Sequence, residues 1–190
     1  DLYGPFSIYD NIESTETENN QMVFGPWSHG DWARYNREKQ VVGNMFFGKN
    51  MAKKFQDDFI TPFFNHHLKG DTDKPKLPEA HVFDTGEKVW NNYENWPPQN
   101  TEKRAFYLAD NEELKEKATD NQEEFISDPE NPVPYTEDIK MVFTPRKYMT
   151  DDQRFAARRP DVLTFETEVL EEDIKISGEI LADLQVATTG

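Results

Sequence analysis

The sequence predicts two incomplete domains of different class: an α/β part over residues 1–70 and an antiparallel β part over residues 79–190. Helical and strand patterns occur in separate blocks instead of alternating along the chain. Between the blocks, residues 71–78 are rich in Lys, Asp and Pro and are predicted to form a linker. A mean hydropathy of −0.91 is low for one self-contained domain of 190 residues. We therefore expect pieces of two larger domains.

Composition narrows the range of partners. A formal net charge of −16 argues against nucleic acid and against an anionic membrane surface, because both are bound through clustered Lys and Arg. The absence of cysteine rules out disulfides and thiolate metal sites within these residues. No apolar run approaches the roughly 20 residues of a membrane-spanning helix. The negative charge is compatible with a cationic small molecule, although an acidic surface more often serves only solubility.

The α/β part begins with a predicted helix that leads into a short strand. Pro5 suits the first turn of a helix, and Phe6, Tyr9 and Ile12 recur at helical spacing on one face. A polar stretch then leads to three apolar residues, 22–24, which are predicted to form a short buried strand. Helix, loop, strand and a following loop is the order found at the end of an α/β-hydrolase sheet.

A longer helix is predicted over residues 45–68, because aromatic and methionine side chains recur there every four residues. Pro62 is expected to kink or restart this helix, with Thr61 as a cap, and Gly70 to end it. His66 and His67 are neighbours in the predicted helix. Their side chains would point about 100° apart, so we expect no metal site there.

The β part shows short apolar or alternating runs separated by turn residues, which is typical of a β-sandwich or jelly roll. The predicted strands are residues 80–83, 89–90, 104–108, 139–143 and 162–167. Residues 174–186 carry apolar side chains of one parity and predict a long half-buried strand, with a bulge or bend at Gly178.

The most informative stretch follows the strand at residues 22–24. Gly25 and Pro26 end that strand, and Trp27-Ser28-His29-Gly30 then places one imidazole on a tight loop. A lone histidine after a strand is usually structural or solvated. The full string Gly-Pro-Trp-Ser-His-Gly, however, resembles the catalytic-histidine loop of the cocaine-esterase and X-prolyl dipeptidyl-peptidase family of serine hydrolases. His29 is therefore the candidate catalytic residue.

Further strings in the β part extend this resemblance over nearly the whole chain. They most resemble the α-amino acid ester hydrolase and glutaryl-cephalosporanic-acid acylase branch, although their prolines and aspartates are turn and packing signatures with no catalytic chemistry. The strings are Gly86-Glu87-Lys88-Val89-Trp90, Trp96-Pro97-Pro98, Ser127-Asp128-Pro129, Pro132-Val133-Pro134-Tyr135, residues 148–156, Arg158-Arg159-Pro160-Asp161-Val162-Leu163 and Ile176-Ser177-Gly178.

The resemblance implies a Ser-His-Asp triad that cleaves a small-molecule ester or amide by acyl transfer, with no cofactor or metal. It also implies the last part of an α/β-hydrolase domain followed by an incomplete jelly roll, periplasmic or extracellular placement, and assembly into homo-oligomers. No Gly-x-Ser-x-Gly elbow occurs in the 190 residues. Ser28 adjoins His29 too closely for attack geometry. The chain is therefore expected to be an inactive fragment that requires the rest of its own catalytic domain.

The role of Asp1 has three interpretations. It lies 28 residues before His29, near the spacing of the family's triad aspartate. The string Asp-Leu-Tyr-Gly-Pro instead resembles the segment just after that aspartate in α-amino acid ester hydrolases, where carboxylates hold the ammonium group of the substrate. We favour the ammonium-binding role, which predicts α-amino acid esters or β-lactams as substrates and disfavours a glutaryl-type acylase. The third interpretation is a solvated terminus.

Three cations follow the histidine: Arg34, Arg37 and Lys39. A solvated loop is the simplest interpretation of this stretch. The functional alternative is an arginine that binds a carboxylate of the substrate through two parallel hydrogen bonds.

Other function classes remain open on the sequence. A non-catalytic β-sandwich module is the main alternative, with Trp90, Tyr93 and Trp96 as a platform for stacking sugars. A dipeptidyl peptidase of the same family is another, as is a member whose triad is broken. A serine elbow upstream of these residues would favour the enzyme over the binding module.

Overall fold

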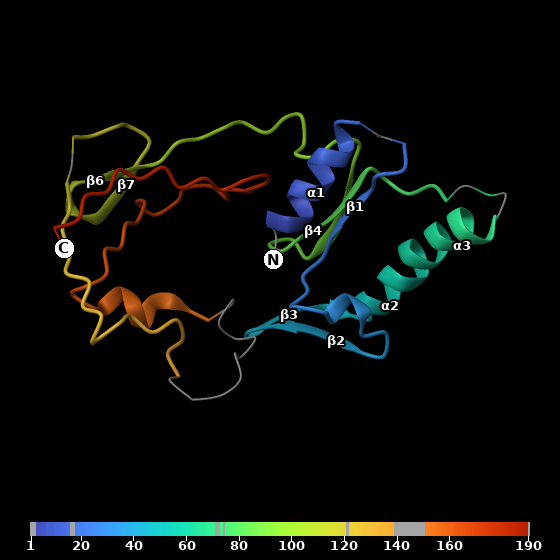
Figure 1. Ribbon diagram of the computed structural model, residues 1–190, viewed down its shortest axis with the longest axis horizontal. Coiled ribbons are helices and arrows are strands. Elements are labelled where there is room, and N and C mark those ends of the chain that lie inside the picture. Colours follow the sequence, from blue (N-terminus) through green and yellow to red (C-terminus); the bar gives the residue numbers. More distant parts are fainter. Residues whose placement is uncertain are drawn as a thin grey trace.

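The computed structural model describes residues 3–15, 18–70, 73, 75–120, 122–138 and 151–189 (Figure 1). It shows two lobes joined by extended chain, which we call the first and the second lobe. The first lobe contains α1 (Tyr3–Glu13), β1 (Met22–Phe24), the 3-10 turn η1 (Asp31–Ala33), β2 (Lys39–Val42), β3 (Met45–Lys49), α2 (Met51–Phe55), the π-helical turn η2 (Gln56–Ile60), α3 (Thr61–Lys69), β4 (Ala80–Asp84) and β5 (Val89–Tyr93). The second lobe contains β6 (Tyr107–Ala109), the turn η3 (Asp110–Glu112), β7 (Glu113–Lys115) and the 3-10 helix η5 (Gln153–Arg158).

The first lobe is built on a three-stranded sheet in the order β1-β4-β5. β1 and β4 are parallel, with Met22 opposite Ala80, whereas β4 and β5 form an antiparallel hairpin with Ala80 opposite Tyr93. The chain between β1 and β4 contains the β2–β3 hairpin and the helices α2 and α3. Parallel neighbours need such a long crossover, since a tight turn joins only antiparallel strands.

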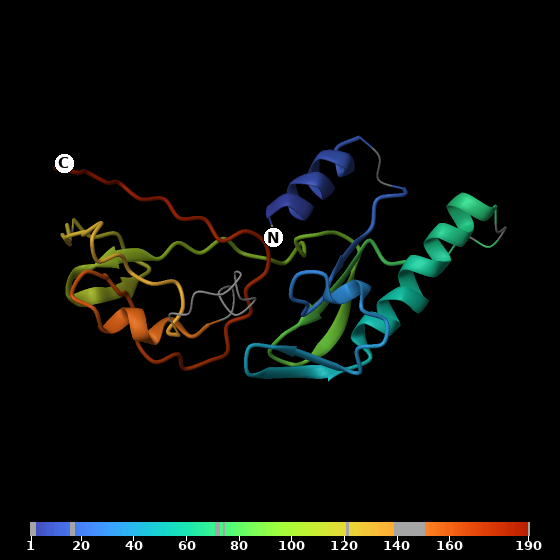
Figure 2. The same ribbon diagram turned by 60° about the horizontal axis from the view of Figure 1, so that its bottom comes forward.

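Helices cover both faces of this sheet (Figure 2). On one face Tyr9 of α1 packs with Met22 and Ala80 in a buried cluster. On the other face Phe83 packs with residues of β3 and α2. Successive side chains of a strand point to opposite faces, so the residues of β4 pack alternately against one cluster and the other. The result is a layered α/β arrangement whose sheet is buried from both sides.

The sheet of the first lobe extends across the predicted linker. β4 pairs with β1 and β5 pairs with β4, so both strands belong to the sheet of the first lobe. The change in architecture comes after β5, where the chain runs extended to β6 in the second lobe (Figure 1).

The prediction of a continuous helix from residue 45 is wrong at its start. Residues 45–49 form β3, and helix begins only at Met51. Gly48 has φ of 143° and Asn50 has φ of 55°, backbone conformations that a helix does not contain. Pro62 lies in the first turn of α3, directly after the π-helical turn. Ile60 and Thr61 both keep helical backbone angles, so the helical backbone continues through this point and the predicted cap at Thr61 is wrong. Gly70 ends α3 in the left-handed conformation, which confirms the predicted stop.

The second lobe contains less strand than predicted. β6 and β7 form a small antiparallel hairpin, and residues 162–167 contribute one isolated bridge, between Glu113 and Glu166. Residues 174–186 are extended but lie in no described strand, and Ile180 is 84% exposed. A strand needs a partner for its backbone groups, and the described part of the chain supplies none to this segment. The predicted strand 139–143 lies outside the described residues.

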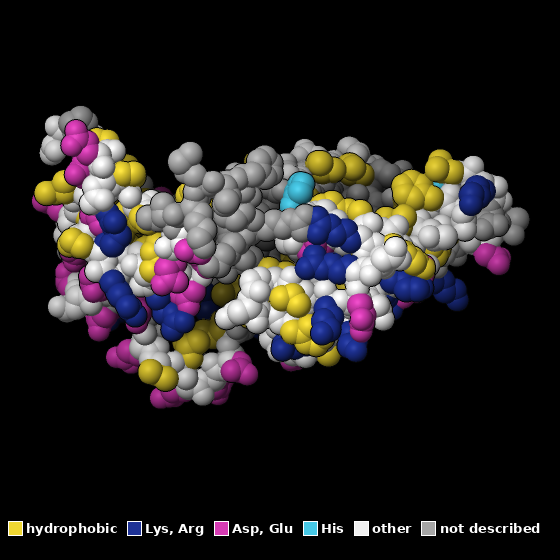
Figure 3. Space-filling model, turned by 90° about the horizontal axis from the view of Figure 1, so that it is seen from below, with side chains coloured by type: hydrophobic (Ala, Val, Ile, Leu, Met, Phe, Trp, Pro, Cys, Tyr) yellow, Lys and Arg dark blue, Asp and Glu magenta, His cyan; other side chains and the backbone are white. Residues whose placement is uncertain are grey.

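Large apolar side chains are exposed on both lobes, and hydrophobic patches are visible on the surface in Figure 3. In the first lobe Tyr3 is 82% and Ile8 63% exposed on the outer side of α1. In the second lobe Val169 is 94% exposed. Exposed apolar surface of this extent is typical of interfaces. It agrees with the expectation that these residues pack against other parts of larger domains.

An ion pair ties the C-terminal segment to the β4–β5 turn. Lys175 Nζ lies 2.5 Å from Asp84 Oδ2 and 3.4 Å from Glu87 Oε1. Asp84 also accepts hydrogen bonds from the backbone N–H groups of Gly86 and Glu87, each at 2.9 Å. Lys175 and these backbone donors hold the pKa of Asp84 below its usual value. The charged form of Asp84 therefore stabilises this junction.

Replacing Lys175 by alanine should lower the thermal midpoint slightly at pH 7, because a partly exposed ion pair contributes about 0.2–1 kcal/mol. Asp84 has a depressed pKa in the folded state, so its contribution is present above its unfolded pKa of about 3.9 and is lost as the pH falls further. The difference between wild type and Lys175→Ala should thus shrink on going from pH 7 to pH 3. Lys117→Ala, at an exposed position of the second lobe, is the control; an equal effect of both substitutions would contradict the prediction.

Candidate functional site

The loop after β1 carries the predicted catalytic histidine, and a close contact within the loop determines its course. The Trp27 N–H donates to the Gly25 carbonyl at 2.8 Å, which folds the Trp27 ring back over Gly25. A Cβ atom on Gly25 would lie 2.5 Å from a carbon of that ring. The turn therefore requires glycine at this position.

The Trp27 ring anchors the loop to the helical layer and to the sheet. Its ring centroid lies 5.0 Å from that of Phe55 in α2 and 5.8 Å from that of Trp90 in β5. Tilted aromatic pairs at these separations are attractive. The backbone that leads to the histidine is thus held from two sides.

His29 is exposed at the tip of this loop, as predicted. Gly30 follows in the left-handed conformation with φ of 75°, which turns the chain into η1. The His29 and Trp32 rings form an edge-to-face pair, and their centroids lie 6.2 Å apart. The imidazole therefore lies beside an aromatic side chain and is accessible to solvent.

A buried carboxylate, Asp31, links the two ends of the turn formed by residues 28–31. Asp31 is 0% exposed, and its Oδ2 accepts hydrogen bonds from the Ser28 hydroxyl and from the Ser28 N–H, the latter at 3.2 Å. In the opposite direction, the Asp31 N–H donates to the Ser28 carbonyl at 3.0 Å. Residues 28 and 31 are thus linked on both the backbone and the side-chain side, with His29 between them.

Cationic and amide groups balance the charge of Asp31. Arg37 Nη1 forms an ion pair with Oδ1, Arg34 Nη1 lies 3.2 Å from the same oxygen, and Gln40 Nε2 donates to Oδ2 at 3.3 Å. Arg37 also donates to the carbonyls of Lys39 and Val41, at 3.1 and 3.4 Å.

Arg34 and Arg37, which were expected to be solvated or to bind substrate, both pair with the buried Asp31. Asp31 itself was not predicted as part of the site. The only available signal was a carboxylate with two arginines three and six residues later.

The other histidines have structural surroundings. His81 of β4 is buried between Phe59 and Trp90, with ring centroids 4.6 and 4.5 Å away, and its Nδ1 contacts the Asn92 side-chain oxygen. Burial lowers the pKa of His81, so the ring is neutral near pH 7. His66 and His67 are adjacent in α3. In the described part of the chain, no group of three or more His, Asp and Glu side chains is placed to hold a metal ion.

The predicted platform for sugars is not formed. Trp90 stacks on His81 on the helix α2 side of the sheet, whereas Tyr93 and Trp96 pack with the cluster around Tyr9 on the other side. Trp90 and Tyr93 are three residues apart in β5, an odd spacing that places them on opposite faces. The prediction of a shared aromatic platform is therefore wrong, because its side chains lie on opposite faces of the sheet.

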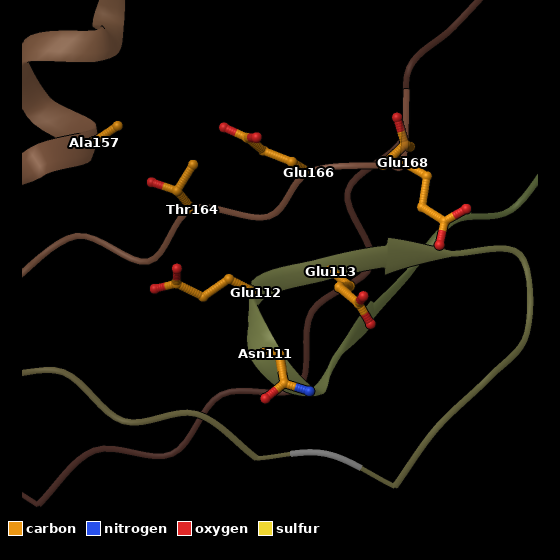
Figure 4. Close-up of a pocket in the computed structure, with 8 residues that line it drawn as sticks. Asn111, Glu112, Glu113, Ala157, Thr164, Glu166 and Glu168 are labelled. Atoms are coloured by element: carbon orange, nitrogen blue, oxygen red, sulfur yellow. The ribbon is translucent and has the colours of Figure 1, made fainter. Parts of the chain in front are cut away.

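An acidic groove lies in the second lobe (Figure 4). Its volume is about 440 Å³, and it is lined by Asn111, Glu112, Glu113, Ala157, Thr164, Glu166, Thr167 and Glu168. The lining contains neither a histidine nor a serine, so the Ser-His pair of a serine hydrolase is not found among these residues. Asp1 lies outside the described residues. Among those described, no helix is both long and apolar enough to cross a membrane.

Comparison with known proteins places the chain in a family. Residues 72–190 match the family described as the X-Pro dipeptidyl-peptidase C-terminal non-catalytic domain. The chain belongs to this family. The match begins within the predicted linker, so the His29 loop precedes it.

Matches to longer proteins include the His29 part. The cocaine esterase of Rhodococcus sp. (strain MB1 Bresler) is 27% identical over 197 residues, which cover 96% of this chain and 32% of the esterase. Among solved structures, an α-amino acid ester hydrolase has 31% identity and a TM-score of 0.77, over 94% of this chain and 31% of its own. An aminopeptidase from the marine sediment archaeon Thaumarchaeota archaeon has 29% identity and a TM-score of 0.77. The match covers 90% of this chain and 29% of the aminopeptidase.

These relatives confirm the resemblance found in the sequence, to the cocaine-esterase and X-prolyl dipeptidyl-peptidase family of serine hydrolases. The chain spans about a third of their length.

Proposed function

We propose that His29 is the general base of a serine-hydrolase triad, and that the intact protein cleaves esters or amides by acyl transfer. The observation that carries the proposal is an exposed histidine on an anchored loop at the end of β1, in a sheet covered by helices on both faces. The hydrolases among the relatives support it. On this proposal the first lobe is the last part of an α/β-hydrolase domain, and the second lobe is the beginning of a jelly roll that contributes no catalytic group.

In this mechanism the chain contributes the proton-transfer step. His29 removes the proton from the serine hydroxyl as the serine attacks the carbonyl carbon, and then returns it to the leaving alkoxide or amine. A carboxylate orients the imidazole and stabilises its protonated form. The serine and the oxyanion donors belong to other parts of the catalytic domain.

We further propose that the substrates are α-amino acid esters or β-lactams with amino-acid-like side chains. This rests on Asp1, which would pair with the α-ammonium group in a site partly shielded from water, where such a pair is stronger. A glutaryl-type acylase needs a cation at the same place, and the aspartate there disfavours that alternative.

The intact protein should hydrolyse an ester with a free α-amino group faster than its N-acetylated counterpart. Asp1→Asn should lower kcat/KM for the free amine about tenfold or more, because a charged hydrogen bond contributes about 1.5–3 kcal/mol, and should leave the acetylated ester unaffected. Asp10→Asn, an exposed carboxylate on α1, is the control. An equal loss on both esters, mainly in kcat, would instead make Asp1 the triad aspartate. No change on either ester would refute both roles.

A further inference from the structure

Asp31 is a buried charge that the proposed proton transfer does not use. Its side chain is 0% exposed, yet it lies two residues from an exposed histidine. Burying a carboxylate is costly unless charges and hydrogen bonds compensate for lost water. Here Arg34, Arg37, Gln40 and Ser28 supply that compensation. These four residues therefore tie the loop together through the Asp31 carboxylate.

The network connects the histidine turn to the β2 strand. Gln40 belongs to β2 and is 1% exposed, and Arg37 is held by the carbonyls of Lys39 and Val41 at the same strand. Asp31 therefore links this strand to Ser28. A shift of Ser28 would move the backbone of His29, since the two residues share a peptide bond.

We propose that Asp31 is a positioning residue for His29: it acts through Ser28, and holds the turn of residues 28–31 in the geometry that presents the imidazole for proton transfer. The inference rests on the proposed function, because it assigns Asp31 a role in that reaction. Misplacement of a catalytic group by about 1 Å can cost roughly 100-fold in rate. The effect should appear in kcat, since Asp31 is fully buried and is not exposed for contact with substrate.

The test uses Asp31→Asn in the intact protein, because asparagine keeps the shape and loses the charge. We expect kcat per active site to fall about 10- to 100-fold, with KM changed by less than about threefold. Active sites are counted with a serine-reactive fluorophosphonate, so that unfolded protein does not enter the value. Asp57→Asn, an exposed carboxylate of η2 paired with Lys53, is the matched control and should leave kcat unchanged.

A double-mutant cycle with Ser28→Ala tests the route of the effect. If Asp31 acts through Ser28, the two substitutions together should lower kcat by much less than the product of their separate effects. The rate of His29 carbethoxylation by diethyl pyrocarbonate gives a readout independent of turnover. It is obtained as the difference between each variant and the same variant carrying His29→Ala, and it should change in Asp31→Asn.

The outcomes separate this inference from the proposed function. If His29→Ala retains full activity, the proposed function fails. If His29→Ala is inactive but Asp31→Asn keeps the wild-type kcat per active site and the wild-type carbethoxylation rate, the positioning role is wrong and the triad assignment stands. A lower thermal midpoint with unchanged kcat per active site would assign Asp31 a purely structural role and would likewise overturn the inference.

Discussion

Replacing His29 by alanine in the intact protein should lower kcat for ester hydrolysis by at least about 10⁴-fold, the order of loss found when a triad member is removed. Without the imidazole, the serine hydroxyl keeps its proton during attack and the leaving group departs without one. KM should change little, because the imidazole contributes chiefly to the transition state. The substitution should leave the fold intact, because the His29 side chain is exposed and belongs to no described buried cluster.

His67→Ala is the matched control, because His67 is also an exposed histidine of the first lobe. It should retain wild-type kcat. Adding imidazole to His29→Ala should restore part of the lost activity if the missing group is a proton acceptor. Wild-type activity in His29→Ala would contradict the assignment of the base.

The second large effect is expected at Gly25. Gly25→Ala places a methyl group 2.5 Å from a carbon of the Trp27 ring, well inside contact distance. The ring cannot simply rotate away, because Phe55 and Trp90 pack against it. Overpacking of this kind costs about 1–3 kcal/mol. The free energy of local opening of β1, measured by amide hydrogen exchange, should fall by that amount.

Gly4→Ala is the matched control for the added methyl group. A Cβ atom at Gly4 meets nothing within 4 Å, and alanine is better than glycine inside a helix by roughly 0.5–1 kcal/mol. Gly4→Ala should therefore be neutral or slightly stabilising. Equal protection of β1 in the two variants would mean that the Trp27 contact does not constrain the turn. Gly25→Ala should also lower kcat, since the same turn leads to His29.

Local patterns predicted the elements around the histidine because their signals lie within a few residues. The apolar spacing of Phe6 and Tyr9 is the spacing of α1, and both side chains pack at the sheet. The glycine and proline after β1 end that strand where predicted. The same reasoning failed at Phe47, which continues the four-residue spacing of the helix but lies in β3. Phe47 and Met51 meet in one buried cluster although they belong to different elements.

Strand prediction in the second lobe failed for a different reason. Apolar and polar side chains alternate over residues 174–186, so an extended chain there has one apolar face. Burying that face requires a neighbouring strand and a covering layer. The described residues provide neither, and Ile176 is 71% exposed. A periodic pattern contains no information about where the partner strand is. The segment is extended, as the alternation predicts, but its apolar side chains are exposed and not half-buried.

The sequence by itself determined α1, β1, the end of α3, the position of His29 on a loop, and the family, because each depends on adjacent residues. Only the tertiary structure decided that β4 and β5 join the sheet of β1 and that Trp90 and Tyr93 face opposite sides. It also decided that Asp31 is buried, with Arg37 and Gln40 as partners. The physical reason is that burial and charge compensation depend on which segments meet across the fold, and strand pairing brings together residues far apart in the chain.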